Sequence, residues 1–106
     1  MSEMNRVEML TQFLRDNPND SFARYGLAME YSKAGDTERA MQEFGNLLAI
    51  NPDYTAGYFM AAQTLARAGK SDEARKMLND GIACAARTGN VHAKSEMEAL
   101  LEELSS

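Results

Sequence analysis

Apolar residues recur along almost the whole chain at intervals of three and four positions, which is the period of an amphipathic helix. In chain order they are Val7, Leu10, Phe13 and Leu14; Leu27, Ala28 and Tyr31; Ala40, Phe44, Leu47 and Leu48; Leu65 and Ala68; Met77, Leu78 and Ile82; and Met97, Leu100, Leu101 and Leu104. The helical period runs through almost every segment, in place of the strict alternation typical of a half-buried strand. The pattern therefore predicts an all-α protein.

Short breaks divide this pattern into six expected helices. The stretches "NPND" (17–20) and "NPDY" (51–54) combine a helix-ending proline with Asn and Asp residues that can cap the next helix. Gly35 and Gly69 suit the left-handed position just past a helix end, and Asp36 and Ser71 are expected to cap the helices that follow. The expected helices are 2–16, 20–34, 37–50, 54–68, 71–87 and 91–104. Short loops make successive helices antiparallel neighbours.

Self-comparison of the sequence indicates two copies of one helical pair at a constant offset, which we call the repeat offset. The positions that it matches are Asn17 and Asn51, Pro18 and Pro52, Tyr25 and Phe59, Ala28 and Ala62, Ala34 and Ala68, Gly35 and Gly69, Ala40 and Ala74, Phe44 and Leu78, and Leu48 and Ile82. Small residues at 28, 40, 62 and 74 would let the two helices of each pair approach closely, while large residues fill the space between pairs.

A helical pair repeated at this offset, the distance from Pro18 to Pro52, resembles the tetratricopeptide repeat (TPR). The pattern of that repeat runs W-x2-L-G-x2-Y, then A-x3-F, then P. The first copy matches it at Leu27, Ala28, Tyr31, Ala40, Phe44 and Pro52, with Arg24 in the place of the Trp. The second copy matches at Tyr58, Ala61, Ala62, Leu65, Ala74 and Leu78, with Ala86 in the place of the proline. The resemblance implies antiparallel helix pairs stacked as a short right-handed TPR-type α-solenoid of about six helices.

We expect a single TPR-like domain over 1–106, with an N-terminal capping helix (1–20), repeat 1 (21–54), repeat 2 (55–88) and a C-terminal capping helix (89–106). Arg6 stands where the repeat has Ala40, which is tolerated if no helix precedes it. The last helix carries apolar residues on one face and Glu96, Glu98, Glu102 and Glu103 on the other, as a terminal helix requires. These ends favour a complete domain over a fragment of a longer array.

Composition and charge narrow the classes of function. At 106 residues the chain is one small domain, and its net charge of −5 with scattered Lys and Arg argues against a nucleic-acid partner. The N-terminus lacks an apolar signal core and no stretch reaches bilayer length, so we expect a cytoplasmic protein without a membrane partner. The single cysteine, Cys84, allows no internal disulfide and is expected to be a small buried hydrophobe.

The sequence offers no candidate catalytic or metal-binding set. His92 is the sole histidine and is expected to be exposed or capping near a helix start. No serine lies in a "GxSxG" motif, and Gly35 and Gly69 are isolated turn residues rather than a phosphate-binding loop. We therefore predict a protein that is not an enzyme and binds no cofactor or metal.

The resemblance implies that a protein or peptide segment binds a concave groove lined by the first helix of each repeat. By register the groove residues are Phe22, Tyr25, Met29, Ser32 and Lys33 in the first repeat and Ala56, Phe59, Met60, Gln63, Ala66 and Arg67 in the second. Tyr25 and Met29 stand where a known subgroup has the Lys and Asn that clamp a C-terminal carboxylate, which argues against that clamp. An apolar, aromatic and Met-containing strip remains.

Two alternatives remain open for this strip. It could instead drive homo-oligomerisation, giving a homodimer, or it could be covered by the chain's own first or last helix. An RNA-binding helical repeat is disfavoured by the acidic balance.

Overall fold

A computed structural model of the chain describes residues 4–106. The described residues form six helices and no strand: α1 (Arg6–Asp16), α2 (Ser21–Lys33), α3 (Thr37–Ile50), α4 (Thr55–Arg67), α5 (Ser71–Thr88) and α6 (Val91–Ser105). The predicted all-α class and helix count are confirmed, and the expected bounds of α2 to α6 agree to within one residue.

Side-chain caps fix where four of the helices begin. Asn5, Asp20, Asp36 and Asn90 each accept a hydrogen bond from the backbone N–H three residues later. The expected start of the first helix at residue 2 is wrong where it can be judged, because the Asn5 cap places residues 4 and 5 before the helix. Residues 2 and 3 lie outside the described part of the chain.

The caps of α4 and α5 differ from the prediction. Ser71 was expected to cap α5, but it is the first helical residue, and Lys70 occupies the cap position without a side-chain cap bond. Helix α4 also lacks a side-chain cap, because its N-cap residue is Tyr54 rather than Asp53 and Tyr54 makes no side-chain cap bond. In the register of the repeat Lys70 corresponds to Asp36, and the lysine ammonium cannot accept a hydrogen bond.

Left-handed glycines end α2, α4 and α5, as the repeat predicts for the first two. Gly35 and Gly69 both have φ of +79°, and Gly89 has φ of +74°. The residue after each glycine donates its backbone N–H to the carbonyl five residues earlier, at 2.9 Å in all three turns. This pattern satisfies carbonyls that the helix end would leave without partners.

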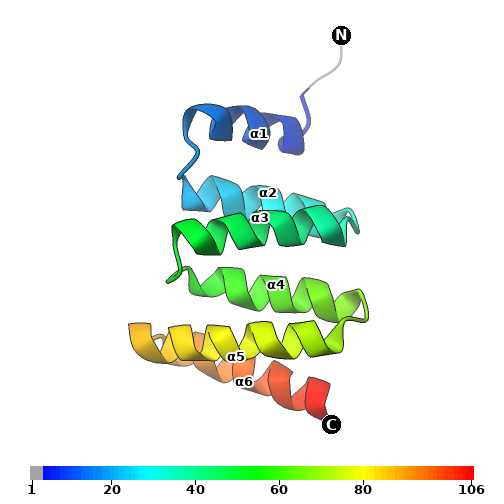
Figure 1. Cartoon of the computed structure of the whole chain (residues 1–106), viewed down its shortest axis with the longest axis vertical. Helices are drawn as coiled ribbons and strands as arrows, with labels where there is room; N and C mark the ends of the chain where they lie inside the picture. The colour runs from blue at the N-terminus through cyan, green and yellow to red at the C-terminus, as the bar shows by residue number, and fades with distance from the viewer. Residues whose placement is uncertain (1–3) are drawn as a thin grey trace. The chain divides into compact units, whose positions relative to one another are not determined.

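The chain divides into two compact units, the first ending at Asn51 and the second running Pro52–Ser106. In the first unit α1 packs against α2, and α2 packs against α3, with successive helices running in opposite directions (Figure 1). One buried cluster of this unit consists of Leu14, Ala23 and Leu27, against which Val7, Leu10 and Tyr31 pack.

In the second unit α5 packs against both α4 and α6, and α4 also contacts α6. The buried cluster contains Ala62, Leu78, Ala85 and Met97, so the last helix supplies part of the core. The glutamates of α6, from Glu96 to Glu103, are exposed, which confirms that its other face is in water. Gly81 on α5 allows α4 and α6 to approach closely, because a Cβ at this position would lie 2.5 Å from Met97 Sδ and 2.6 Å from Tyr58 Cβ.

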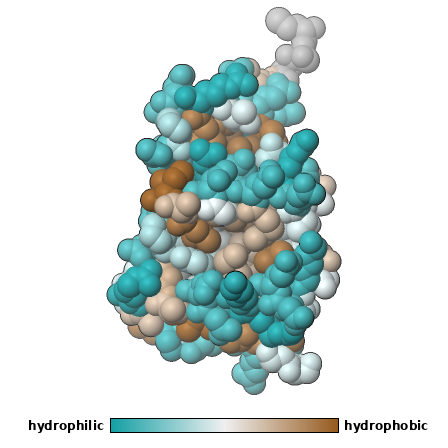
Figure 2. All heavy atoms as spheres, in the orientation of Figure 1, coloured by the Kyte–Doolittle hydropathy of each residue, from teal (hydrophilic) through white to brown (hydrophobic). Residues whose placement is uncertain are grey.

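The small residues of the repeat are buried as predicted. Ala28, Ala40, Ala62 and Ala74 have no exposed surface, and large neighbours such as Phe44 and Leu78 are also fully buried. In the view of Figure 2 hydrophilic side chains cover most of the surface, with smaller hydrophobic areas between them, including one between α1 and α2.

Candidate functional site

The predicted groove residues of the first unit lie on α2 at positions 22, 25, 29, 32 and 33. Steps of three and four residues keep the first four on one side of the helix, and Lys33 follows in its last turn. Phe22 is 77% exposed, the highest value among the exposed large hydrophobic residues described. Tyr25, Met29 and Ser32 are half-buried, so this side of α2 is a surface with an apolar base.

Tyr25 has a structural contact that the sequence did not reveal. Its ring meets the fully buried ring of Phe44 on α3 edge-on, with centroids 6.5 Å apart. Burial raises the pKa of the Tyr25 phenol above its ordinary value of 10.0. Tyr25 therefore joins the predicted groove side of α2 to the core of its unit, and only part of its surface is exposed.

Lys33, in the last turn of α2, is paired within the unit. Lys33 Nζ lies 3.6 Å from Glu30 Oε2, and the same oxygen accepts a 3.2 Å hydrogen bond from Arg6 Nε on α1. The Lys33 side chain is nevertheless 70% exposed. A surface pair of this kind contributes little to stability.

The second-unit groove residues Phe59, Met60, Gln63 and Arg67 lie on α4. Phe59, Met60 and Gln63 are half-buried and Arg67 is exposed. Phe59 packs against the buried cluster that includes Met97 of α6. Part of Phe59 is therefore held by the core of this unit, to which α4, α5 and α6 all contribute.

Phe22 also belongs to a pocket that sequence reasoning did not identify. The pocket lies between α1 and α2, has a volume of about 280 Å³, and is lined by Arg6, Leu10, Phe13, Asp20, Phe22, Ala23 and Gly26. We refer to it as the α1–α2 pocket. The repeat offset could have pointed to it, since it places Leu10 at the position of Phe44, and Phe44 is fully buried while Leu10 is only half-buried.

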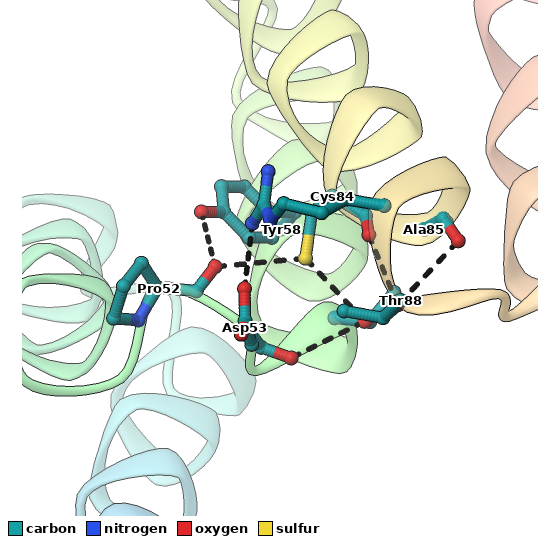
Figure 3. Close-up of polar contacts among 8 residues, drawn as sticks. Pro52, Asp53, Tyr58, Cys84, Ala85 and Thr88 are labelled. Carbon is teal, nitrogen blue, oxygen red and sulfur yellow. Dashed lines mark hydrogen bonds and ion pairs between the residues drawn. The ribbon is translucent and has the colours of Figure 1, made fainter.

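Figure 3 shows a polar cluster in the second unit, where the loop before α4 meets the C-terminal half of α5. The carbonyl of Pro52 accepts hydrogen bonds from Tyr58 Oη at 2.7 Å and from Cys84 Sγ at 3.5 Å. Arg87 Nη2 donates to Asp53 Oδ1 at 2.6 Å. These contacts anchor the loop to a helix that lies well beyond it along the chain.

The chemistry of this cluster is structural. Cys84 is 1% exposed, which confirms the prediction of a buried cysteine. Burial raises the pKa of the Tyr58 phenol, and the nearby Cys84, Asp80 and Asp53 raise it further, against a lowering by Arg87. The bond to Asp53 in turn raises the pKa of Arg87. At neutral pH the tyrosine is therefore a neutral donor, which is the form its bond to Pro52 requires.

His92 lies near the start of α6 with its side chain 87% exposed, as predicted, and its Nε2 is 3.2 Å from Glu96 Oε1. Among residues 4–106 no three His, Cys, Asp or Glu side chains gather as a metal site would require. None of the helices in the described part of the chain is both long and apolar enough to cross a bilayer.

The two units are thus built from antiparallel helix pairs with a repeated alanine and glycine pattern, which defines a helical-repeat protein. A family model for the tetratricopeptide repeat matches residues 31–97, and a second with the same description matches residues 9–42. A TPR repeat-containing protein of Pseudomonas aeruginosa is 32% identical over 98 residues, which is 92% of this chain and 93% of that protein. The chain belongs to the tetratricopeptide-repeat family.

Solved structures share the fold at low sequence identity. A protein from Bordetella parapertussis, solved in solution, has a TM-score of 0.83 at 22% identity, over 99% of this chain and 90% of that one. PcrH, crystallised in complex with the chaperone-binding region of PopD, has a TM-score of 0.86 at 19% identity, over 93% of this chain and 75% of that one. These similarities establish the all-α TPR-type fold.

Proposed function

We propose that the chain is a non-catalytic protein-interaction module that holds an apolar segment of another protein against α2, the first helix of its first repeat. The observation that carries the proposal is the exposure of Phe22 beside half-buried Tyr25 and Met29 on α2. Aromatic and methionine side chains left at the surface of a small acidic domain suit adaptable contacts with an apolar partner.

The fold supports this proposal. PcrH has the same fold and was crystallised with the chaperone-binding region of another protein, PopD. A helical-repeat surface of this kind can therefore hold a protein segment. A catalytic role has no comparable support, because His92 is exposed and pairs with Glu96 rather than with a nucleophile.

The partner segment that fits best carries apolar side chains with an acidic group at one end. The apolar side chains would cover Tyr25 and Met29, and the acidic group would approach Lys33, whose ammonium is largely exposed. The contribution of Lys33 would be mainly to orientation and association rate, because exposed charges add little affinity.

The test uses the purified full chain to capture proteins from its native host, followed by titration with each captured protein in pure form. The variants are Met29→Glu and Lys33→Glu, with Val91→Glu as the control because Val91 is an exposed hydrophobic residue on α6. Replacing a central apolar side chain by a charged one is expected to weaken binding about 30-fold or more. Circular dichroism verifies that each variant keeps its helices.

The expected result is that Met29→Glu loses the partner while Val91→Glu retains it. A partner that binds Met29→Glu and Lys33→Glu as tightly as the unaltered chain would show that the groove side of α2 is not the binding surface. Light scattering on the same samples separates the alternative, in which the strip joins copies of the chain. In that case Met29→Glu would dissociate an oligomer instead of releasing another protein.

A further inference from the structure

Helix α1 presents to solvent a face that the repeat buries elsewhere. At the repeat offset, Arg6, Leu10 and Phe13 correspond to Ala40, Phe44 and Leu47. The latter three have no exposed surface on α3, which packs against α2. On α1, by contrast, Phe13 is 46% exposed and Leu10 is only half-buried. In the described part of the chain, no helix covers this face of α1 as α2 covers the corresponding face of α3.

The α1–α2 pocket is the vacant space that results. Its floor is apolar, and Gly26 leaves it open, since the only neighbours of a Cβ added there are the two methyl carbons of Leu10 at 3.5 and 3.7 Å. Phe13 and Phe22 stand at its rim as exposed aromatic rings. When a surface of complementary shape binds, the exposed aromatic ring and the apolar pocket beside it can both be buried.

The charges at the two ends of the pocket indicate which surface matches. Arg6 lines one end, where it also bonds Glu30 near the end of α2. Asp20 lines the other end, where its side chain caps the start of α2. A surface with a cation at one end, a carboxylate at the other and apolar side chains between them is complementary to itself when rotated by half a turn. Self-complementarity is what a two-fold interface requires.

The geometry points to a second copy of this chain as the occupant of the α1–α2 pocket, in a two-fold dimer with the two α1 helices antiparallel. Arg6 of each copy then faces Asp20 of the other, and the aromatic rims of Phe13 and Phe22 cover the partner's Leu10 and Gly26. This interface shares Phe22 with the groove side of α2, whereas Phe13 belongs only to the interface and Met29 only to the groove side. The variants Phe13→Glu and Met29→Glu therefore test the dimer and the proposed function separately.

The other helix that a second copy could offer fits less well. Helix α6 of another copy would continue the array from end to end, but its exposed face carries Glu96, Glu98 and Glu102. Placing these carboxylates over Leu10 and Phe13 would remove them from water without partners, which costs far more than the contact returns. Such end-to-end contacts would also produce an open series of oligomers rather than a closed pair.

The test is sedimentation equilibrium of the full chain from about 1 µM to about 500 µM, a range that covers weak dimers. The average mass is expected to rise from 11.7 kDa towards twice that value and no further. Phe13→Glu is expected to raise the dimer dissociation constant about 30-fold or more, since it places a charge against the apolar Leu10 of the partner copy. Val91→Glu, an equally large change at an exposed site of α6, is expected to leave it unchanged.

Asp20→Asn provides a second variant that does not disturb the fold, because Asn caps a helix as well as Asp does while lacking the charge. We expect it to weaken the dimer about threefold to tenfold at low salt, with the difference vanishing near 1 M salt. A mass of 11.7 kDa at every concentration, a dimer insensitive to Phe13→Glu, or oligomers beyond two copies would each overturn the proposal.

Discussion

Gly81 and Gly45 are both helical glycines, but their surroundings predict opposite effects of substitution by alanine. At Gly81 an added Cβ would lie 2.5 Å from Met97 Sδ and 2.6 Å from Tyr58 Cβ, whereas at Gly45 no heavy atom lies within 4 Å. Carbon and sulfur atoms prefer separations of about 3.5 Å or more, so the shortfall at Gly81 is about 1 Å on two sides. Met97 can shift its flexible side chain, but Tyr58 Cβ is fixed to the backbone of α4.

The magnitudes follow from two terms. Replacing glycine by alanine within a helix stabilises it by about 1 kcal/mol, and this term applies at both sites. Overpacking a tight contact costs about 1–3 kcal/mol, and this term applies only at Gly81. Gly45→Ala should therefore be more stable than the unaltered chain by about 1 kcal/mol, and Gly81→Ala should be less stable than Gly45→Ala by about 1–3 kcal/mol.

The assay is urea unfolding followed by circular dichroism on the full chain, with thermal melts as a second measure. A difference of about 1 kcal/mol corresponds to about 4–8 °C in Tm for a domain near this size. The rate at which a thiol reagent labels buried Cys84 reports the opening of the second unit and should rise in Gly81→Ala. Equal free energies of unfolding for the two variants would refute the close approach of α4, α5 and α6 at Gly81.

Two further predictions concern the helix starts and the tyrosines. Lys70→Asp should stabilise the chain by about 0.5–2 kcal/mol in urea unfolding, because it supplies the missing side-chain cap of α5. The backbone of Lys70 (φ −99°, ψ 64°) is nearly that of Asp36 (φ −88°, ψ 76°), whose side chain does cap its helix. An unchanged unfolding midpoint would contradict this prediction. Because burial raises the pKa of both Tyr25 and Tyr58 above 10.0, the folded chain holds these protons at a pH where the unfolded chain releases them. The free energy of unfolding should therefore fall as the pH rises above 10.0, and Tyr25→Phe should reduce that slope in melts across this range; an unchanged slope would contradict it.

The fold was largely predictable because the repeat fixes backbone positions that few residues can occupy. Gly35 and Gly69 mark left-handed turns, and Ala28 and Ala40 mark a close helix contact, so spacing alone located these features. The capping residues of α4 and α5 were less predictable. Ser71 is a good capping residue by type, but the cap position falls one residue earlier, and a one-residue shift is invisible to a pattern of residue types.

The candidate site was predictable only in part. Register identified which side of α2 and α4 carries Tyr25 and Phe59, but not how deeply each side chain reaches into its unit. That depth depends on partners distant in sequence, namely Phe44 for Tyr25 and the cluster with Met97 for Phe59. The α1–α2 pocket escaped prediction because Leu10 and Phe13 have the period of a buried helix face, and period does not show whether anything covers that face.

The order of helix contacts within each unit has a consequence for how the chain folds. Within the described units, consecutive helices make all the helix–helix contacts except that of α4 with α6. Chains with such local contacts lose little entropy on closing each loop, so we expect folding on the microsecond to millisecond timescale. The contact of α4 with α6 spans the longest stretch of chain, and Met97 can complete its cluster only after α4 and α5 have paired. The docking of α6 is therefore expected to be a late step, which stopped-flow measurements on the Gly81→Ala variant would detect as faster unfolding.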